Sequence, residues 1–198
     1  FLNNDSGLTI RLGDSNIIYS NYFKNTMKGL RTYGFDQLIY GNYFEGGITG
    51  LQLPAADPTT KAETDNPAPY YQTDRIKVMN NVFVNPGTQA FLFGNSFNRS
   101  RMYVLLPKDS LYQGNEIYIT NDRAKDFNKD PAAFAYFHSL EGIRQNTAYI
   151  TSDHNKGNMN IEDESAVRYV YAENHDIPKP EQILGFTPFE SNDERVGA

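Results

Sequence analysis

The sequence predicts an all-β protein, specifically a right-handed single-stranded parallel β-helix, and three observations support this fold class. A unit of about 21 residues recurs along the chain. Its segments are β-branched and aromatic, and they are too short to contain a helix as well as strands. Asn recurs at an equivalent turn in successive copies. Strands that return every 21 residues stack in parallel, and each coil then buries its inward side chains against the next.

The repeat is clearest in the first quarter of the chain. The segment NIIYSNYFK at 16–24 reappears as QLIYGNYFE at 37–45, and the same shift of 21 carries Gly29 onto Gly50. Two weaker copies occupy 77–84 and 112–118. The whole unit therefore repeats, and not one strand alone.

Four asparagines are predicted to form a ladder through the stack: Asn21, Asn42, Asn81 and Asn115. Asn tolerates the left-handed αL backbone conformation of a tight turn, and its amide can pair with the amides above and below it. We therefore interpret these residues as scaffold and not as a binding site.

The chain is predicted to be one β-helix domain over 1–198, or the C-terminal part of one. The spacing of 39 from Asn42 to Asn81 requires an insertion, and residues 54–73 contain four prolines with no periodic apolar pattern, which predicts an inserted loop. Beyond residue 121 the repeat fades. Residues 122–198 are predicted to be an irregular C-terminal region packed on the last coils, with a short helix within 130–140.

Composition excludes several functions. The 198 residues include no cysteine, which rules out disulfides, Cys-type zinc and a thiol nucleophile. No stretch of about 18 apolar residues occurs, so we expect no membrane partner. A formal net charge of -6 and a sequence pI near 5.0 argue against a nucleic-acid partner.

The outer face of the first coils is the candidate site. Along 7–14, alternation of side chains places Leu8, Ile10 and Leu12 inward and Thr9 and Arg11 outward. Aligning the next coil from its leading glycine places Arg31 beside Thr9. Residues 1–34 carry a net charge of +2 within an acidic chain, which indicates a site for an anion. The four cations of this segment are Arg11, Lys24, Lys28 and Arg31.

Other motifs are weaker. The three histidines, His138, His154 and His175, share no metal-ligand spacing and are interpreted as surface residues. The oxygen-rich segment 153–164 matches no calcium-loop pattern and is interpreted as a solvated turn. No nucleophilic triad, phosphate loop or dinucleotide motif is present.

The segment GLTIRLGD at 7–14, the two NYF repeats and GLR at 29–31 resemble consecutive coils of the polysaccharide lyase family that contains chondroitinase B and alginate lyases. The resemblance is good over residues 7–53 and fair to about residue 120. It implies β-elimination of a uronic-acid polymer, in which a calcium ion neutralises the sugar carboxylate and a lysine removes the neighbouring proton. Arg11 matches the arginine that stabilises the leaving oxygen, and Arg31 matches a position that grips the substrate carboxylate.

The chain also departs from the family pattern. The family's lysine and calcium ligands lie on the coil before the arginine, whereas this sequence begins ten residues before Arg11. Leu12 stands where the family commonly has His. Lys24 and Lys28 lie in the turn of another coil and are not assigned as the base. We therefore expect calcium ligands and base to lie outside this chain, on an N-terminal segment or second chain, and this chain alone to be inactive.

Two functions follow as expectations. The first is part of a polysaccharide lyase acting on an anionic polysaccharide, with alginate favoured over chondroitin or dermatan because no dense sulfate-binding Arg cluster occurs. The second is a non-catalytic carbohydrate-binding or adhesin-like β-helix, which the tyrosines favour as stacking platforms. The family implies a bacterial protein that is secreted or periplasmic. The residues expected to contact substrate are Arg31, Thr9, Tyr33, Lys28, Tyr70 and Tyr71, with Arg11 as the catalytic residue.

Overall fold

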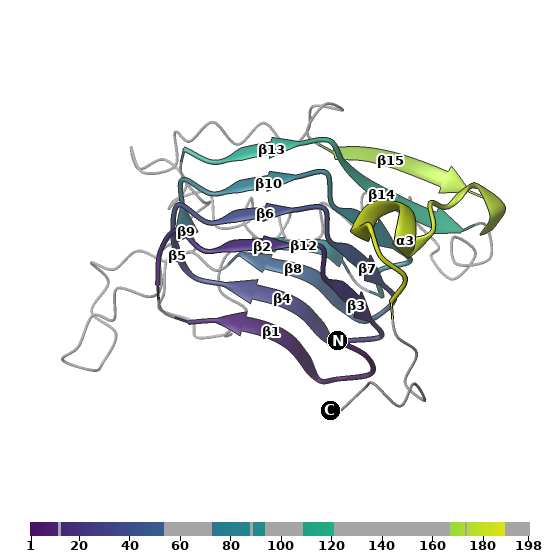
Figure 1. Cartoon of the computed structure of the whole chain (residues 1–198), viewed down its shortest axis with the longest axis horizontal. Helices are drawn as coiled ribbons and strands as arrows, with labels where there is room; N and C mark the ends of the chain where they lie inside the picture. Colours follow the sequence, from purple (N-terminus) through teal and green to yellow (C-terminus); the bar gives the residue numbers. More distant parts are fainter. Residues whose placement is uncertain are drawn as a thin grey trace, which may run out of the picture.

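In the computed structural model, parallel β-strands make up about half of the residues that the structure describes (Figure 1). The structure describes residues 1–11, 13–53, 73–87, 89–93, 109–120, 167–172 and 174–188. Every strand pairing within these residues is parallel. The all-β fold class is therefore confirmed. None of the helices in this part of the chain is long and apolar enough to cross a membrane.

The strands form three larger parallel sheets and one short pair. The first sheet has the order β1 (Ser6–Ile10), β4 (Lys28–Thr32), β8 (Thr49–Leu53), β12 (Gln89–Phe93). The second has the order β2 (Ile17–Tyr19), β6 (Leu38–Tyr40), β10 (Lys77–Met79), β13 (Leu111–Gln113). The third has the order β3 (Tyr22–Lys24), β7 (Tyr43–Glu45), β11 (Val82–Val84), β14 (Asn115–Thr120), β15 (Val167–Ala172). The short pair joins β5 (Gly34–Phe35) to β9 (Thr73–Asp74).

The chain visits the three sheets in turn and then returns to the first. It passes from β1 to β2 to β3 before β4 pairs with β1, and the next two passes repeat this order. We call each pass a circuit. The register between the first complete circuits matches the sequence repeat, because Ile18 pairs with Ile39 and Phe23 with Phe44, both 21 residues apart. The period seen in the sequence is thus the length of one circuit.

The first circuit is one residue longer than the second, in agreement with the sequence, where Gly7 and Gly13 are six residues apart and Gly29 and Gly34 are five residues apart. Ile10 pairs with Thr32, 22 residues away, whereas Ile17 pairs with Leu38, 21 residues away. The extra residue therefore lies between residues 11 and 16, at the corner between β1 and β2. Arg11 stands at this corner, directly after β1.

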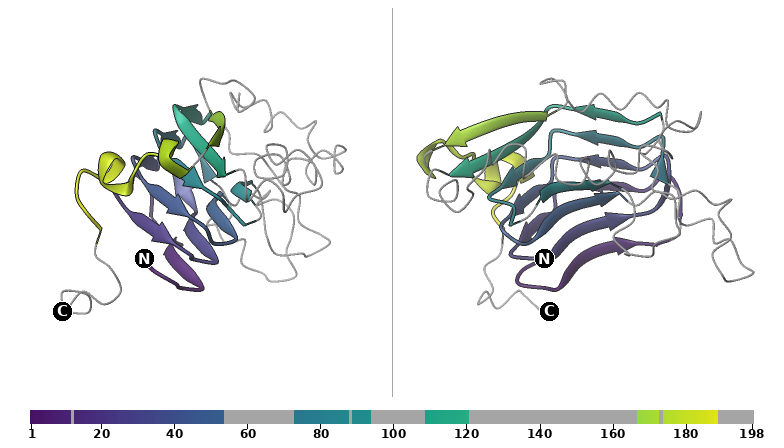
Figure 2. Two further views of the ribbon diagram at one scale, coloured as in Figure 1. Left: turned by 90° about the vertical axis from the view of Figure 1, so that its right-hand side faces the viewer. Right: turned by 180° about the vertical axis from the view of Figure 1, so that it is seen from behind.

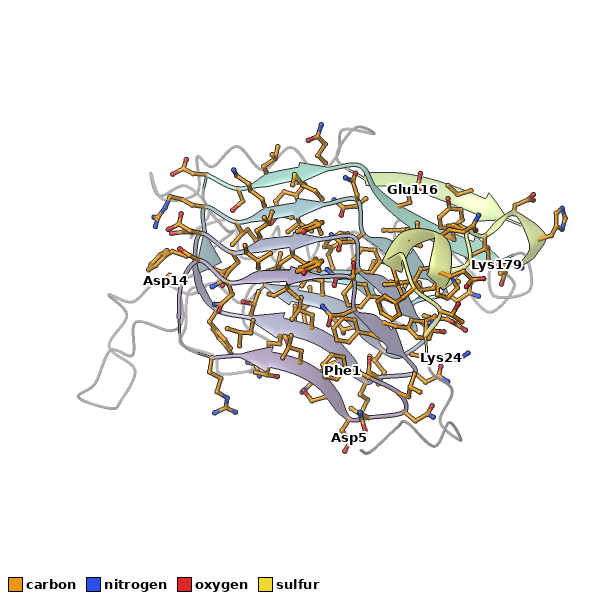
Figure 3. All side chains as sticks on the ribbon, in the orientation of Figure 1. Phe1, Asp5, Asp14, Lys24, Glu116 and Lys179 are labelled. Atoms are coloured by element: carbon orange, nitrogen blue, oxygen red, sulfur yellow. The ribbon has the colours of Figure 1, made fainter. Side chains whose placement is uncertain are left out.

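Rows of like side chains fill the space between the sheets (Figure 3). The phenylalanine rings of successive circuits stack with centroids 4.7 Å apart from Phe23 to Phe44 and from Phe44 to Phe83. Phe1 continues the column at 4.9 Å from Phe23. Rows of aliphatic side chains lie beside this column and are completely buried. Burial of each such side chain stabilises the fold by roughly 1.5–3 kcal/mol. These aliphatic residues include Leu30, Leu51, Ile39 and Val78.

The recurring glycine before each inward leucine has a steric cause. A Cβ at Gly29 would lie 2.8 Å from the Phe44 ring, and a Cβ at Gly50 would lie 2.6 Å from the Phe83 ring. Both approaches are closer than real Cβ contacts allow. Glycine therefore recurs at these positions because the stacked phenylalanine rings leave no room for a Cβ atom.

The predicted asparagine ladder is confirmed. The Nδ2 atom of Asn21 donates to Oδ1 of Asn42 at 3.0 Å, Asn42 to Asn81 at 2.9 Å, and Asn81 to Asn115 at 3.0 Å. The same Oδ1 atoms accept backbone N–H groups from the circuit before. Asn42, Asn81 and Asn115 are fully buried, so each rung satisfies polar groups that water cannot reach.

One detail of the ladder prediction is wrong. The ladder asparagines do not adopt the αL conformation, because the residue before each of them does: Ser20, Gly41, Asn80 and Gly114 have φ between 51° and 61°. The positive φ turns the chain sharply there. The following Asn then returns to an ordinary conformation, which aims its amide along the stack.

The C-terminal region contributes to the fold in two places. β15 pairs with β14 over its whole length and extends the third sheet. The segment 174–188, which we call the flank segment, contains the 3-10 turn η5 (Asn174–Asp176) and the helix α3 (Pro180–Leu184). It packs on the outer face of the third sheet through Leu184, beside Tyr43 (Figure 2). The flank segment therefore contacts β7 in the middle of the stack as well as later strands.

Candidate functional site

A row of side chains crosses the outward face of the first sheet. Thr9 of β1 pairs in register with Arg31 of β4, Arg31 with Gln52 of β8, and Gln52 with Leu92 of β12. Neighbouring strands lie roughly 4.8 Å apart, so the row advances by that distance at each step. The residues that flank Arg31 and Gln52 are buried in the core, and alternation therefore directs the row away from it. We call these four residues the outer row.

Burial along the outer row is unusual for polar side chains that point away from the core. Thr9 is exposed, whereas Arg31 is 8% exposed and Gln52 only 1%. Thr9 also hydrogen-bonds the hydroxyl of Ser6 at 3.2 Å. Arginine and glutamine are mostly exposed residue types in folded proteins. The outer row therefore brings a cation and an amide into an environment of low water content, where electrostatic attraction is strong.

Arg31 is held by an aromatic ring. Its guanidinium carbon lies 4.9 Å from the centroid of the Tyr33 ring, in a cation–π arrangement. Tyr33 is itself buried, and its backbone N–H donates to the carbonyl of Ile10. The attraction between the guanidinium charge and the face of the aromatic ring helps to hold Arg31 in place. Three of the predicted contact residues, Thr9, Arg31 and Tyr33, are thus brought together.

The other predicted cations are not all part of this group. Arg11 is exposed at the corner that follows β1. Lys28 is exposed at the opposite end of the strand pair, opposite Ser6, and roughly 13 Å separate the ends of a strand of five residues. Lys24 lies on the third sheet and forms an ion pair with Glu45 at 3.3 Å. It is far from Asp14, which marks the corner beyond Arg11 (Figure 3).

The predicted basic patch is therefore divided between two sheets. Lys28 and Arg31 belong to the first sheet, Arg11 directly follows its strand β1, and Lys24 is paired with Glu45 on the third sheet. Tyr70 and Tyr71, which were predicted to stack on substrate, lie outside the described residues, as do Leu12 and residues 54–72 of the inserted loop predicted at 54–73; Thr73 begins β9.

A second arginine, Arg75, also lies over an aromatic ring and is paired with a carboxylate. Arg75 lies 4.9 Å over the Phe35 ring, the same distance that separates Arg31 from Tyr33. Its guanidinium also donates two hydrogen bonds to Asp36, at 2.9 and 2.8 Å. These bonds hold the pKa of the Asp36 carboxyl below its usual value. Arg75 thus shows how an arginine that lies over an aromatic ring binds a carboxylate in this fold.

Gln52 was not among the residues predicted from the sequence. It stands 21 residues after Arg31, which is the spacing of one circuit, and this spacing was the available signal. Its burial was not predictable, because an outward side chain is ordinarily solvated.

The outer row can bind an anion but supplies no group that removes a proton. Its polar members are a hydroxyl, a guanidinium and an amide, and none of these is a general base near neutral pH. Across the described residues, no cluster of three or more His, Asp or Glu side chains is positioned to hold a metal ion. The calcium ion that the resemblance implies has no ligand set among these residues.

Comparison with known proteins adds no assignment. No protein-family model, no curated protein and no solved structure matches this chain.

Proposed function

We propose that this chain is part of a right-handed single-stranded parallel β-helix that binds a uronic-acid polysaccharide on its outer row, and that it belongs to a polysaccharide lyase. Alginate is the favoured polymer, and chondroitin or dermatan is the second. A secreted or periplasmic bacterial protein would meet such a polymer, and this localisation is part of the proposal.

The β-helix part of the proposal is supported by the order of the strands. Each circuit of about 21 residues contributes one strand to each of three parallel sheets. Crossovers between parallel strands of one sheet are right-handed in roughly 98% of cases, which favours a right-handed coil. Stacked phenylalanine and asparagine columns are typical of such a repeat.

The binding part of the proposal is carried by one observation: Arg31 lies over Tyr33, beside Thr9, on an outward face where it is almost completely buried. A planar guanidinium in water-poor surroundings binds a carboxylate through two parallel hydrogen bonds. The Tyr33 ring beside it is buried and supports the guanidinium. A polymer that carries one carboxylate on each sugar matches the guanidinium.

The catalytic part of the proposal is supported by the resemblance alone. Arg11 is exposed at the end of β1, one alternation beyond Thr9, and a permanent cation there would stabilise negative charge on a leaving glycosidic oxygen. Proton removal requires a base from outside the outer row. The alternative is therefore a carbohydrate-binding β-helix without catalysis, which is favoured by the absence of a proton acceptor from the outer row itself.

The test compares Arg31→Lys with a matched control, Arg75→Lys. Both substitutions keep the charge and remove the planar fork, but only Arg31 lies on the outer row. In affinity electrophoresis through gels that contain alginate, we expect wild type and Arg75→Lys to be retarded equally. Arg31→Lys should bind about tenfold more weakly, because a lysine cannot make the bidentate contact.

The lyase and the binding alternative are distinguished with the full-length protein that also carries the base. Unsaturated sugar products absorb ultraviolet light, and the lyase proposal predicts that the full-length protein releases them from alginate, whereas this chain alone binds alginate without releasing them. Equal rates of release by the full-length wild type and its Arg11→Ala variant would contradict the role given to Arg11. Equal retardation of Arg31→Lys and wild type would contradict the binding proposal.

A further inference from the structure

Gln52 is the most deeply buried polar side chain of the outer row. It is 1% exposed and lies in register between Arg31 on one side and Leu92 on the other. Its neighbours along β8, Leu51 and Leu53, both belong to the core and are completely buried. Gln52 therefore points outward and shares a face with Arg31.

The amide of Gln52 is not used by the fold. Within the described part of the chain, neither its Oε1 nor its Nε2 atom has a hydrogen-bond partner, although both atoms are shielded from water. A buried polar group without a partner destabilises a protein, and such groups are rare in native structures. An amide in this state indicates a group that binds something else.

Gln37 shows that this fold can satisfy a buried glutamine. Gln37 is completely buried, and its Nε2 atom donates to the carbonyls of Gly13 at 2.8 Å and Tyr33 at 3.1 Å. Its Oε1 atom accepts the backbone N–H of Asn16 at 3.1 Å. The two glutamines belong to the same stack but differ in their contacts. Gln37 joins the backbone at a corner through three hydrogen bonds, whereas the amide of Gln52 makes none within the described residues.

The chemistry of an amide restricts the ligand. Its oxygen needs a donor and its nitrogen needs an acceptor, and a sugar hydroxyl provides both. A carboxylate or a sulfate only accepts, so it would leave Oε1 unsatisfied. Arg31, one strand away, has the opposite preference because it only donates. The pair therefore matches a sugar that presents hydroxyls beside a carboxylate.

We propose that Gln52 is a specificity-determining residue that binds free hydroxyls of the sugar next to the carboxylate held by Arg31. This inference rests on the function proposed above and adds the selection of polymers with free hydroxyls over O-acetylated or O-sulfated ones. Leu92 occupies the next position of the same row, so the row already contains an apolar side chain one strand away. The inference predicts that an apolar side chain at position 52 is compatible with folding.

The first test measures stability. We compare thermal unfolding of Gln52→Leu and Gln37→Leu with wild type. Removing an amide that has no partner should raise the midpoint for Gln52→Leu, whereas Gln37→Leu should lower it by breaking three hydrogen bonds. A lower midpoint for Gln52→Leu would mean that the amide has a structural partner, and the inference would be overturned.

The second test measures selectivity, with Gln113→Leu on the exposed face of β13 as the control. Binding to a polyuronate is compared with binding to the same polymer after O-acetylation. Wild type and Gln113→Leu should prefer the free polymer by about tenfold, and Gln52→Leu should lose that preference.

The outcomes separate the two proposals. If Arg31→Lys weakens binding while Gln52→Leu retains the wild-type preference, the proposed function stands and the role of Gln52 is rejected. If wild type binds neither polymer, the proposed function fails, and the inference about Gln52 fails with it.

Discussion

The contacts of a single residue in this chain could be predicted from the circuit period wherever the sequence of one circuit repeats that of the next. The asparagine ladder could be predicted because each Asn meets an equivalent Asn, so the same amide serves as donor and acceptor at every rung. The pairing of Thr9 with Arg31 was predicted for the same reason. The burial of Gln52 could not be predicted, since it depends on what covers an outward face and not on the local pattern.

Asn81 lies inside the ladder, and it and the asparagines on both sides of it, Asn42 and Asn115, are fully buried. Its amide donates to Ile39 and Asn115 and accepts two N–H groups from Asn42. Asn81→Ala leaves several buried groups without partners, and at about 1–3 kcal/mol for each unsatisfied group we expect a loss of roughly 3–5 kcal/mol in the free energy of unfolding. Urea titration followed by circular dichroism measures this loss. Asn4→Ala, at an exposed side chain, is the control, and equal midpoints for the two variants would contradict the structural role of the ladder.

At the scale of elements, strands of the repeat were predictable and their attachments were not. Each strand of 16–24 has its counterpart in 37–45, so the two sets of strands fall into register. β15 lies far beyond the last recognisable repeat, and no repeat spacing in the sequence predicts its pairing with β14. The flank segment likewise packs through a few apolar side chains, which a short irregular sequence does not reveal.

Tyr43 links the flank segment to the third sheet. Its hydroxyl donates to the carbonyl of Pro178 at 2.9 Å, and an ionised tyrosine cannot make this bond. Burial, followed by the nearby Glu45 carboxylate, raises the pKa of Tyr43 well above its usual value near 10. The folded state therefore keeps the proton more tightly than the unfolded chain. Stability is unaffected below about pH 10 and falls as the pH rises above that value.

The Tyr43→Phe variant tests this alkaline dependence. Phenylalanine has no proton to lose, so the drop in thermal midpoint between about pH 9 and pH 11 should be smaller in Tyr43→Phe than in wild type. Tyr19→Phe, at a side chain that is 54% exposed on the second sheet, is the control and should keep the wild-type drop. An identical drop in all three proteins would show that the proton of Tyr43 does not contribute to stability.

At the scale of the whole molecule, stacking of circuits creates the proposed binding surface. Each circuit adds one residue to the outer row, and the row therefore has the regular spacing that an extended polymer requires. Lys24 and Arg75, which face other surfaces, are paired with the carboxylates of Glu45 and Asp36. Lys28 and Arg31 lie on the first sheet of an acidic protein. The net charge alone did not predict this.

The central claim is that the outer row recognises the carboxylate of a sugar polymer. The most direct measurement is calorimetric titration of the chain with an oligomer of uronic acid and with the same oligomer after its carboxyl groups have been reduced to alcohols. We expect the acidic oligomer to bind at least about tenfold more tightly, because a charge-assisted bidentate contact to Arg31 is lost on reduction. Equal affinity for the two oligomers, or no binding of the acidic one, would contradict the account.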